Sequence, residues 1–257
     1  MKPRTEELLY HLLWHVDLLM RPTFRNLTGS FEGWAYRKGF LRQLQQLESR
    51  RLLERQPGSS AAEAIYRLSD RGRLIALGGR DPIAQWNRDW DGRWRMVLFD
   101  LPEDQATARV KLRRYLRSHG FGYLQKSVWI SPDPLSNISQ ELSTCVADVE
   151  SVLTLEARPA SGETDAGIVK GAWDFAAINR RYEACLQVFA DRPQTPVKEG
   201  LAADALQRWA QHEKRVWLEA VSADPLLPDR LLPDGYLGKR AWHHRVGALA
   251  DAARLIR

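Results

Sequence analysis

Residues 90–103 read "WDGRWRMVLFDLPE", and the apolar run Met96–Phe99 at their centre decides how the chain is divided into domains. Consecutive apolar residues in one short segment are typical of a strand covered on both faces, so we predict a buried strand over 93–101. Asp100 ends the run two residues before Pro102. A carboxylate there is either a ligand of a catalytic metal ion or a structural residue of the following turn, and the segment alone leaves both open.

The residues after this strand alternate between helix and strand patterns. In chain order they predict a helix over 103–118, a strand pair within 120–131, a helix over 135–146 and strands over 151–158 and 168–173. Strands alternating with two helices over about 80 residues favour a ferredoxin-like α+β sandwich. The linker-like sequence "GGRDP" (78–82) comes first, so we expect this middle domain to span residues 81–173.

The excess positive charge lies entirely in the first 80 residues. These hold 14 Lys and Arg against 8 Asp and Glu, whereas the remaining 177 residues hold 24 of each class. A basic segment beside a neutral body is typical of a nucleic-acid-binding domain, because phosphate neutralisation supplies most of the non-specific affinity. A solvated face with extra arginines would give the same count, so charge alone does not decide between the two.

The order of predicted elements in residues 1–80 favours a winged helix-turn-helix. The patterns predict helices over 5–19 and 33–51, strands over 51–56 and 65–68 around the polar turn 57–64, and a short last helix capped by Ser69. In this motif the last helix before the hairpin enters the major groove, and the hairpin reaches a neighbouring groove. A three-helix interaction module with a solvated basic face is the alternative.

The residues predicted to contact DNA have side chains suited to phosphate or base edges. We expect Arg37, Lys38, Arg42 and Gln45 in the major groove, Arg25 on backbone phosphate, and Arg55, Ser59, Ser60 and Arg67 in the wing.

Residues 174–257 are predicted to form a helical domain, with helices over 175–190 and 201–221 and a proline-rich, extended connection within 223–246. Adjacent His243 and His244 point about 100° apart on a helix, so we interpret them as surface or interface residues and not as joint metal ligands.

Neither a metal site nor a cofactor is predicted. Cys145 and Cys185 lack the CxxC spacing of zinc sites and are interpreted as ordinary core or surface thiols. No window reaches the ~18 consecutive apolar residues of a membrane span, and the N-terminal residues lack a signal-peptide pattern. We therefore expect a cytoplasmic protein with no membrane partner.

Four stretches in this order resemble the PaaX family of bacterial transcriptional repressors. They are "WDGRWRMVLFDLPE" (90–103), "GFGYLQKSVWISP" (120–132), "WDFAAINRRY" (173–182) and "DPLLPDRLLPDGYLGKRA" (224–241). The family's architecture is a winged helix-turn-helix, a central Cas2-like domain and a C-terminal helical domain, which corresponds to the division 1–80, 81–173 and 174–257.

The resemblance implies a homodimer that binds a double-stranded DNA operator and releases it when an aryl-acyl coenzyme A, such as phenylacetyl-CoA, binds. It places dimerisation in the central domain and effector binding in the central or C-terminal domain. Leu41 stands where the family's recognition pattern would carry an arginine, so the operator sequence does not follow from the resemblance.

The effector would need aromatic contacts for its acyl group and cations for its phosphates. Trp90, Trp94, Trp129 and Trp173 are candidates for an aromatic pocket or for the core. We select Trp173, Lys170, Arg180 and Arg181 as the effector-binding candidates because they lie near one another in the sequence.

The alternative function is a metal-dependent nuclease that uses Asp100, because Cas2-like proteins that cut place an aspartate at this strand end and pair it across a dimer. Two such carboxylates could hold Mg²⁺. Glu103 and Asp104 offer no dedicated second ligand set, since acidic residues in a first helical turn complement the helix dipole in any case. The preferred prediction is therefore a regulator and not an enzyme, with Asp100 structural or at the dimer interface.

Overall fold

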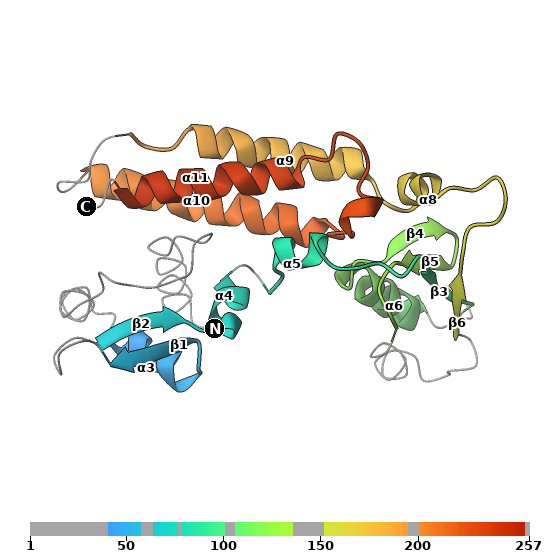
Figure 1. Ribbon diagram of the computed structural model, residues 1–257, viewed down its shortest axis with the longest axis horizontal. Coiled ribbons are helices and arrows are strands. Elements are labelled where there is room, and N and C mark those ends of the chain that lie inside the picture. Colours follow the sequence, from blue (N-terminus) through green and yellow to red (C-terminus); the bar gives the residue numbers. More distant parts are fainter. Residues whose placement is uncertain are drawn as a thin grey trace. The chain divides into compact units, whose positions relative to one another are not determined.

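The computed structural model describes residues 41–57, 64–76, 79–100, 106–135, 152–194 and 201–254 (Figure 1). The chain divides into two compact units, the first made of residues 1–81, 184–218 and 239–257 and the second of residues 82–183 and 219–238. The helix predicted over 5–19, and all but the first residue of the helix predicted over 135–146, lie outside the described residues. The three-domain boundaries stay a prediction.

A helix, a two-stranded hairpin and a second helix follow one another in the first unit (Figure 1). They are α3 (Leu41–Ser49), β1 (Leu53–Pro57), β2 (Ala64–Leu68) and α4 (Asp70–Ala76). The predicted cap at Ser69 is confirmed, because its Oγ accepts a hydrogen bond from the Gly72 N–H at 3.0 Å. Residues 1–40 lie outside the described residues, so the winged helix-turn-helix as a whole stays a prediction.

The second unit contains the predicted α+β domain. Its described elements are β3 (Trp94–Phe99), α6 (Ala106–Ser118), β4 (Gly122–Gln125), β5 (Val128–Ser131) and β6 (Val152–Ala157). The strand order is β4-β5-β3-β6, and every neighbouring pair is antiparallel. Because the first strand lies between the third and the fourth, the order is that of a ferredoxin-like sheet, as predicted.

Both faces of strand β3 are covered, which explains its unbroken apolar sequence. On one face, Val97 and Phe99 pack with Trp129 of β5 and with Leu112 and Leu116 of α6. On the other face, a second cluster combines Trp90, Trp94 and Ile130 with Val169, Ala172, Leu227 and Leu231. Trp90, Trp94 and Trp129 are thus core residues, with at most 9% of each exposed.

The strand predicted over 168–173 is wrong, because this segment forms helix α8 (Asp165–Ala172). Thr164 caps the helix by accepting a hydrogen bond from the Gly167 N–H at 3.0 Å, and Asp165 lies in its first turn. Val169 and Ala172 are three residues apart and both face the core, which is helical spacing. The short apolar run 168–173 could not distinguish a buried strand from a helix by its composition.

Three long helices make up the C-terminal part of the chain: α9 (Phe175–Ala190), α10 (Leu201–Ala223) and α11 (Gly238–Arg254). The first two confirm predictions, α10 extending two residues further. The proline-rich connection ends at residue 237 and includes a short 3-10 turn, η3 (Asp229–Leu231). A short helix, α5 (Pro82–Trp86), begins at the last residue of the predicted linker 78–82. No helix among the described residues is long and apolar enough to cross a membrane.

Candidate functional site

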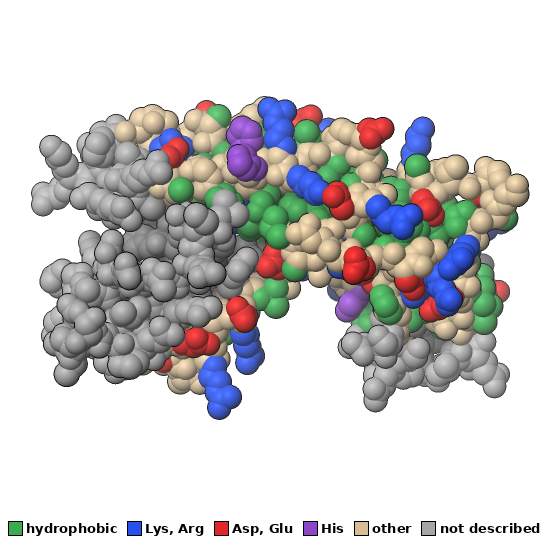
Figure 2. All heavy atoms as spheres, in the orientation of Figure 1, with side chains coloured by type: hydrophobic (Ala, Val, Ile, Leu, Met, Phe, Trp, Pro, Cys, Tyr) green, Lys and Arg blue, Asp and Glu red, His purple; other side chains and the backbone are tan. Residues whose placement is uncertain are grey.

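Two of the predicted DNA-contacting residues have described side chains. Arg42 and Gln45 are both exposed on α3, where their spacing of three residues places them on one helix face. Arg55 and Arg67 lie on β1 and β2, opposite Tyr66 and Glu54 in the hairpin register. The other predicted contacts, Arg25, Arg37, Lys38, Ser59 and Ser60, lie outside the described residues. On the face drawn in Figure 2, acidic and basic side chains are interspersed, in agreement with the even charge count of residues 81–257.

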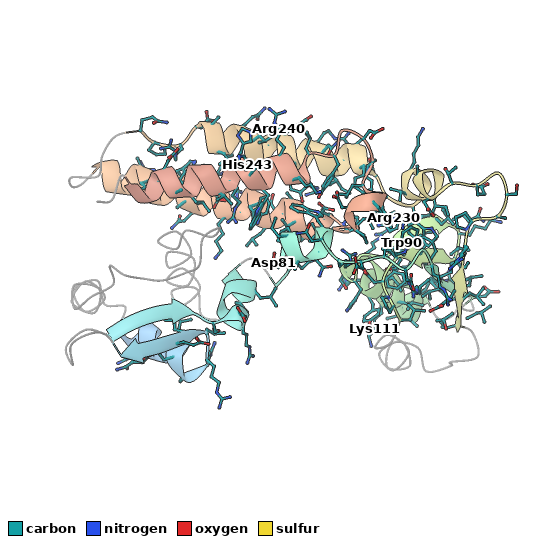
Figure 3. The ribbon with its side chains drawn as sticks, viewed as in Figure 1. Asp81, Trp90, Lys111, Arg230, Arg240 and His243 are labelled. Carbon is teal, nitrogen blue, oxygen red and sulfur yellow. The ribbon has the colours of Figure 1, made fainter. Side chains whose placement is uncertain are left out.

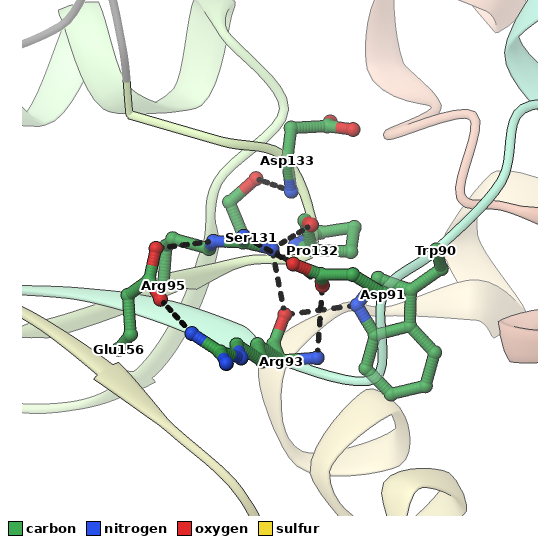
Figure 4. Close-up of polar contacts among 8 residues, drawn as sticks. All are labelled: Trp90, Asp91, Arg93, Arg95, Ser131, Pro132, Asp133 and Glu156. Atoms are coloured by element: carbon green, nitrogen blue, oxygen red, sulfur yellow. Dashed lines mark hydrogen bonds and ion pairs between the residues drawn. The ribbon is translucent and has the colours of Figure 1, made fainter.

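The charged residues of the segment "WDGRWR" (90–95), which are Asp91, Arg93 and Arg95, hold the start of β3 in place (Figure 4). The Arg95 guanidinium, 6% exposed, donates to both Asp91 carboxylate oxygens, at 2.8 and 2.6 Å, and to the carbonyl of Pro132 at 3.0 Å. It also contacts Glu156 of β6 at 3.3 Å, and Arg93 pairs with the same carboxylate at 2.9 Å. The segment therefore joins the strand start to both of its neighbours.

These contacts shift the ionisation of the carboxyl groups. The hydrogen bond from Arg95 lowers the pKa of Asp91, and the hydrogen bond from Arg93, assisted by the charge of Arg95, lowers the pKa of Glu156. Both carboxylates are consequently ionised at neutral pH, and their role is structural.

Asp100 follows β3 directly, and its side chain is exposed. Glu103 and Asp104 lie outside the described residues. Within the described ranges, no three His, Cys, Asp or Glu side chains gather as metal ligands would. His243 and His244 are both exposed on α11, which agrees with the prediction of surface or interface residues. Figure 3 labels His243 on this helix.

A cavity of about 420 Å³ lies within the second unit. Its aromatic walls come from Phe121, Tyr123, Trp129 and Trp173, and the end of α10 closes it through Ser222–Pro225. Two exposed arginines also line it: Arg117 of α6, whose guanidinium lies 5.7 Å from the centre of the Trp129 ring, and Arg181 of α9. Aromatic rings beside cations can hold an apolar, planar group that carries an anionic substituent.

Asp224 is a buried acceptor in the wall of this cavity, with 1% of the residue exposed. Its carboxylate accepts hydrogen bonds from the Tyr182 hydroxyl at 2.5 Å, from the Tyr236 hydroxyl and from the Leu226 N–H at 2.8 Å. Burial raises the pKa of both tyrosines, so their hydroxyls stay protonated and continue to donate. Trp86 Nε1 donates to Tyr236 at 3.1 Å and extends the network.

The effector-binding candidates separate into two pairs. Trp173 and Arg181 line the cavity, whereas Lys170 and Arg180 are exposed and do not line it. Trp173 is held by a hydrogen bond from its ring N–H to the Gly120 carbonyl at 3.2 Å.

Sequence reasoning missed Arg117, Tyr123 and Asp224 as cavity residues. Arg117 and Tyr123 flank a turn far from residue 224 in the sequence, and no local pattern predicts that they share a cavity. For Asp224 the sequence offered only a local signal, because an aspartate before a proline commonly accepts a hydrogen bond from the backbone two residues further on, as it does here from Leu226.

Two family models match consecutive parts of the chain. The PaaX protein central Cas2-like domain matches residues 87–169, and the PaaX-like protein C-terminal domain matches residues 173–253. This chain belongs to the PaaX family. The first match contains the whole four-stranded sheet, from β3 to β6, together with most of α8. The second contains α9, α10, all of α11 but its last residue, and Asp224 with Tyr182 and Tyr236, so the cavity residues come from both PaaX domains.

The chain is also similar to a curated protein of this family and to a solved structure. The transcriptional repressor PaaX of Escherichia coli (strain K12) is 28% identical over 186 residues, which cover 69% of this chain and 58% of the relative. The uncharacterized protein Rv0674 from Mycobacterium tuberculosis is 22% identical and superposes with a TM-score of 0.53 over 98% of each chain. The second likeness concerns the fold alone.

Proposed function

We propose that this PaaX-family chain is a DNA-binding transcriptional repressor. The observation that carries the proposal is the exposed pair Arg42 and Gln45 on one face of α3, next to the β1–β2 hairpin, in the basic third of the chain. Arginine pairs with guanine and glutamine with adenine in the major groove. The curated relative is named a transcriptional repressor, which supports the same function.

We propose that the effector is an aryl-acyl coenzyme A, such as phenylacetyl-CoA, and that its aryl-acyl end enters the cavity. The aromatic walls suit a phenyl ring, and the exposed guanidinium groups of Arg117 and Arg181 can donate charge-assisted hydrogen bonds to the thioester carbonyl. Helix α10 contributes residues 222–223 to the cavity and continues back through residues 201–218 of the first unit. A ligand that displaces the end of α10 therefore acts on a helix shared by both units.

The functional molecule is a homodimer in this proposal. Strand β6 lies at one edge of the sheet and carries Leu153 and Leu155, which are 54% and 42% exposed. An edge strand with exposed leucines is a suitable surface for a second copy of the chain. Replacing both leucines with glutamate is expected to shift the protein from dimer to monomer in sedimentation equilibrium. An unchanged dimer would place the interface elsewhere.

The DNA-binding proposal is tested with a fluorescent duplex from the region upstream of the gene that encodes this chain. We expect the Arg42→Ala/Gln45→Ala variant to bind this duplex at least about tenfold more weakly, since each base contact contributes about 1–3 kcal/mol of discrimination. Affinity for a random duplex is expected to change much less. Equal affinity of the variant and the wild type for the upstream duplex would remove α3 as the recognition element.

The effector proposal is tested by titrating phenylacetyl-CoA into the protein–DNA complex. The wild type is expected to release DNA, and Arg181→Gln is expected to require a higher concentration because it removes a cation from the cavity. Arg180→Gln is the matched control, because this neighbour does not line the cavity. Release at equal concentrations in all three proteins would show that the effector binds elsewhere.

Asp100 offers a direct check against the nuclease alternative. The wild type and Asp100→Ala are each incubated with DNA and Mg²⁺. We expect intact DNA with both proteins. Cleavage that disappears in Asp100→Ala would require an enzymatic function for this domain.

A further inference from the structure

The first unit has a hollow of its own, lined by three arginines, at the point where α3 ends and α4 begins. The hollow measures about 700 Å³ and is lined by Ser49, Arg50, Arg51, Leu52, Arg71 and Ile75. The side chains of Arg50, Arg51 and Arg71 are all exposed. Among the described residues, no carboxylate forms an ion pair with these three guanidinium groups.

The backbone holds these arginines in a fixed arrangement. Arg51 has φ of 56°, the left-handed conformation that usually ends a helix with glycine, and this turn directs Leu52 and Leu53 into the core. Ser69 then joins the second half of the site to the first: its Oγ donates to the Arg51 carbonyl at 2.7 Å, and its N–H donates to the Leu52 carbonyl at 3.0 Å.

Close packing completes the arrangement. A Cβ atom at Gly72 would lie 2.0 Å from the Leu52 carbonyl oxygen, so only glycine allows α4 to approach this closely. Arg71 is the residue before this contact and is therefore held beside Arg50 and Arg51. The fold therefore brings the backbone positions of all three arginines to one place, where their side chains line the hollow.

The hollow continues the face of α3 that carries Arg42 and Gln45. Residues 42, 45 and 49 are spaced by three and four, so they share one helix face, and Ser49 lines the hollow. Seven residues of α-helix span about 10 Å. The major groove is about 12 Å wide, so a helix that presents Arg42 to base edges brings its last turn to the flanking sugar-phosphate backbone.

We propose that Arg50, Arg51 and Arg71 form a phosphate-binding site that grips the DNA backbone beside the groove contacted by α3. This inference rests on the proposed DNA-binding function and adds residues that position the helix without contacting bases. Arginine suits this role because its planar guanidinium binds phosphate oxygens through two parallel hydrogen bonds. Phosphate contacts set affinity and register but carry no sequence information directly.

The experiment compares the wild type with Arg50→Gln/Arg51→Gln/Arg71→Gln in DNA titrations at several salt concentrations. The slope of log K against log salt is expected to fall in magnitude by about 0.9 for each phosphate that the variant no longer neutralises, up to about 2.7 for three. The ratio of affinities for the upstream and random duplexes is expected to stay unchanged. Circular dichroism and thermal melting verify that the variant is folded.

The matched control is Arg158→Gln/Arg208→Gln/Arg240→Gln, which removes the same net charge from exposed positions outside the hollow. A slope that is unchanged in the Arg50/Arg51/Arg71 variant, or reduced equally in the control, overturns the proposal. If pyrophosphate binding, measured by calorimetry without DNA, is then lost in that variant, the site belongs to a free phosphorylated ligand. A wild type that binds no DNA would instead refute the proposed function itself.

Discussion

At the scale of single residues, a buried ion pair between α10 and α11 restricts which residues the helical core can accept. Glu213 of α10 and Arg245 of α11 are 0% and 1% exposed, and Arg245 Nε donates to Glu213 Oε1 at 2.6 Å. The guanidinium carbon also lies 4.7 Å from the centre of the Trp217 ring. Burial raises the pKa of Glu213, and the charge of Arg245 opposes that rise. Neither charge could remain buried without the other.

Removing one partner is expected to be far more harmful than removing both. Arg245→Met should lower the free energy of unfolding by about 3–5 kcal/mol, because it leaves the Glu213 carboxylate buried without its cation. The Arg245→Met/Glu213→Leu variant should recover most of this loss. Urea denaturation of the three proteins measures the difference, and Arg245→Met with wild-type stability would contradict it.

The loss should also depend on pH. Without Arg245 the pKa of Glu213 rises further above its unfolded value, so the folded variant takes up a proton more readily than the unfolded chain. Its deficit relative to the wild type is therefore expected to shrink as the pH falls from 8 toward about 5. A deficit that is constant over this interval would show that the cost is not electrostatic.

At the scale of elements, the close contact between β4 and the end of α8 requires a glycine at position 122. An added Cβ at Gly122 would lie 2.6 Å from the Trp173 ring and 2.7 Å from Ala172 Cβ. Gly171, near the end of α8, would place its Cβ 3.6 Å from Leu124, an ordinary contact. Close packing therefore requires glycine at position 122 but allows a larger residue at position 171, although both lie where β4 meets α8.

Alanine substitution separates them. Gly122→Ala is expected to destabilise the protein by about 1–3 kcal/mol, because the ring or the strand must move. Gly171→Ala is expected to be neutral or stabilising by up to about 1 kcal/mol, since alanine favours the helix. Thermal melting compares the two, and the expectation fails if Gly122→Ala is as stable as Gly171→Ala.

The ion pairs at the start of β3 are expected to contribute to the stability of the folded protein. Because the pKa values of Asp91 and Glu156 are lowered in the folded state, the stability they provide is present above their unfolded pKa values and is lost as the pH falls through the folded ones. The melting temperature of Asp91→Asn/Glu156→Gln should thus lie below that of the wild type at pH 7 and converge with it below about pH 4. A difference in melting temperature that is the same at pH 7 and below pH 4 would show that these ion pairs do not stabilise the fold.

At the scale of the whole molecule, patterns local in sequence predicted most elements, whereas contacts distant in sequence were not predicted. Met96–Phe99 correctly indicated a strand covered on both faces, and the resemblance correctly indicated the PaaX family. The segment 168–173 failed because its helix is set by Thr164, which lies before the apolar run. Asp224 and Arg117 meet at the cavity only through the fold, so no spacing rule could reveal them.

The central proposal is that this chain binds DNA through its basic third and releases it on binding an aryl-acyl-CoA. The most direct measurement is a nuclease-protection footprint of the purified protein on the region upstream of its own gene, with and without phenylacetyl-CoA. We predict a discrete protected site that disappears when the thioester is added, and no effect of free coenzyme A. The absence of any protected site at low salt would contradict the proposal.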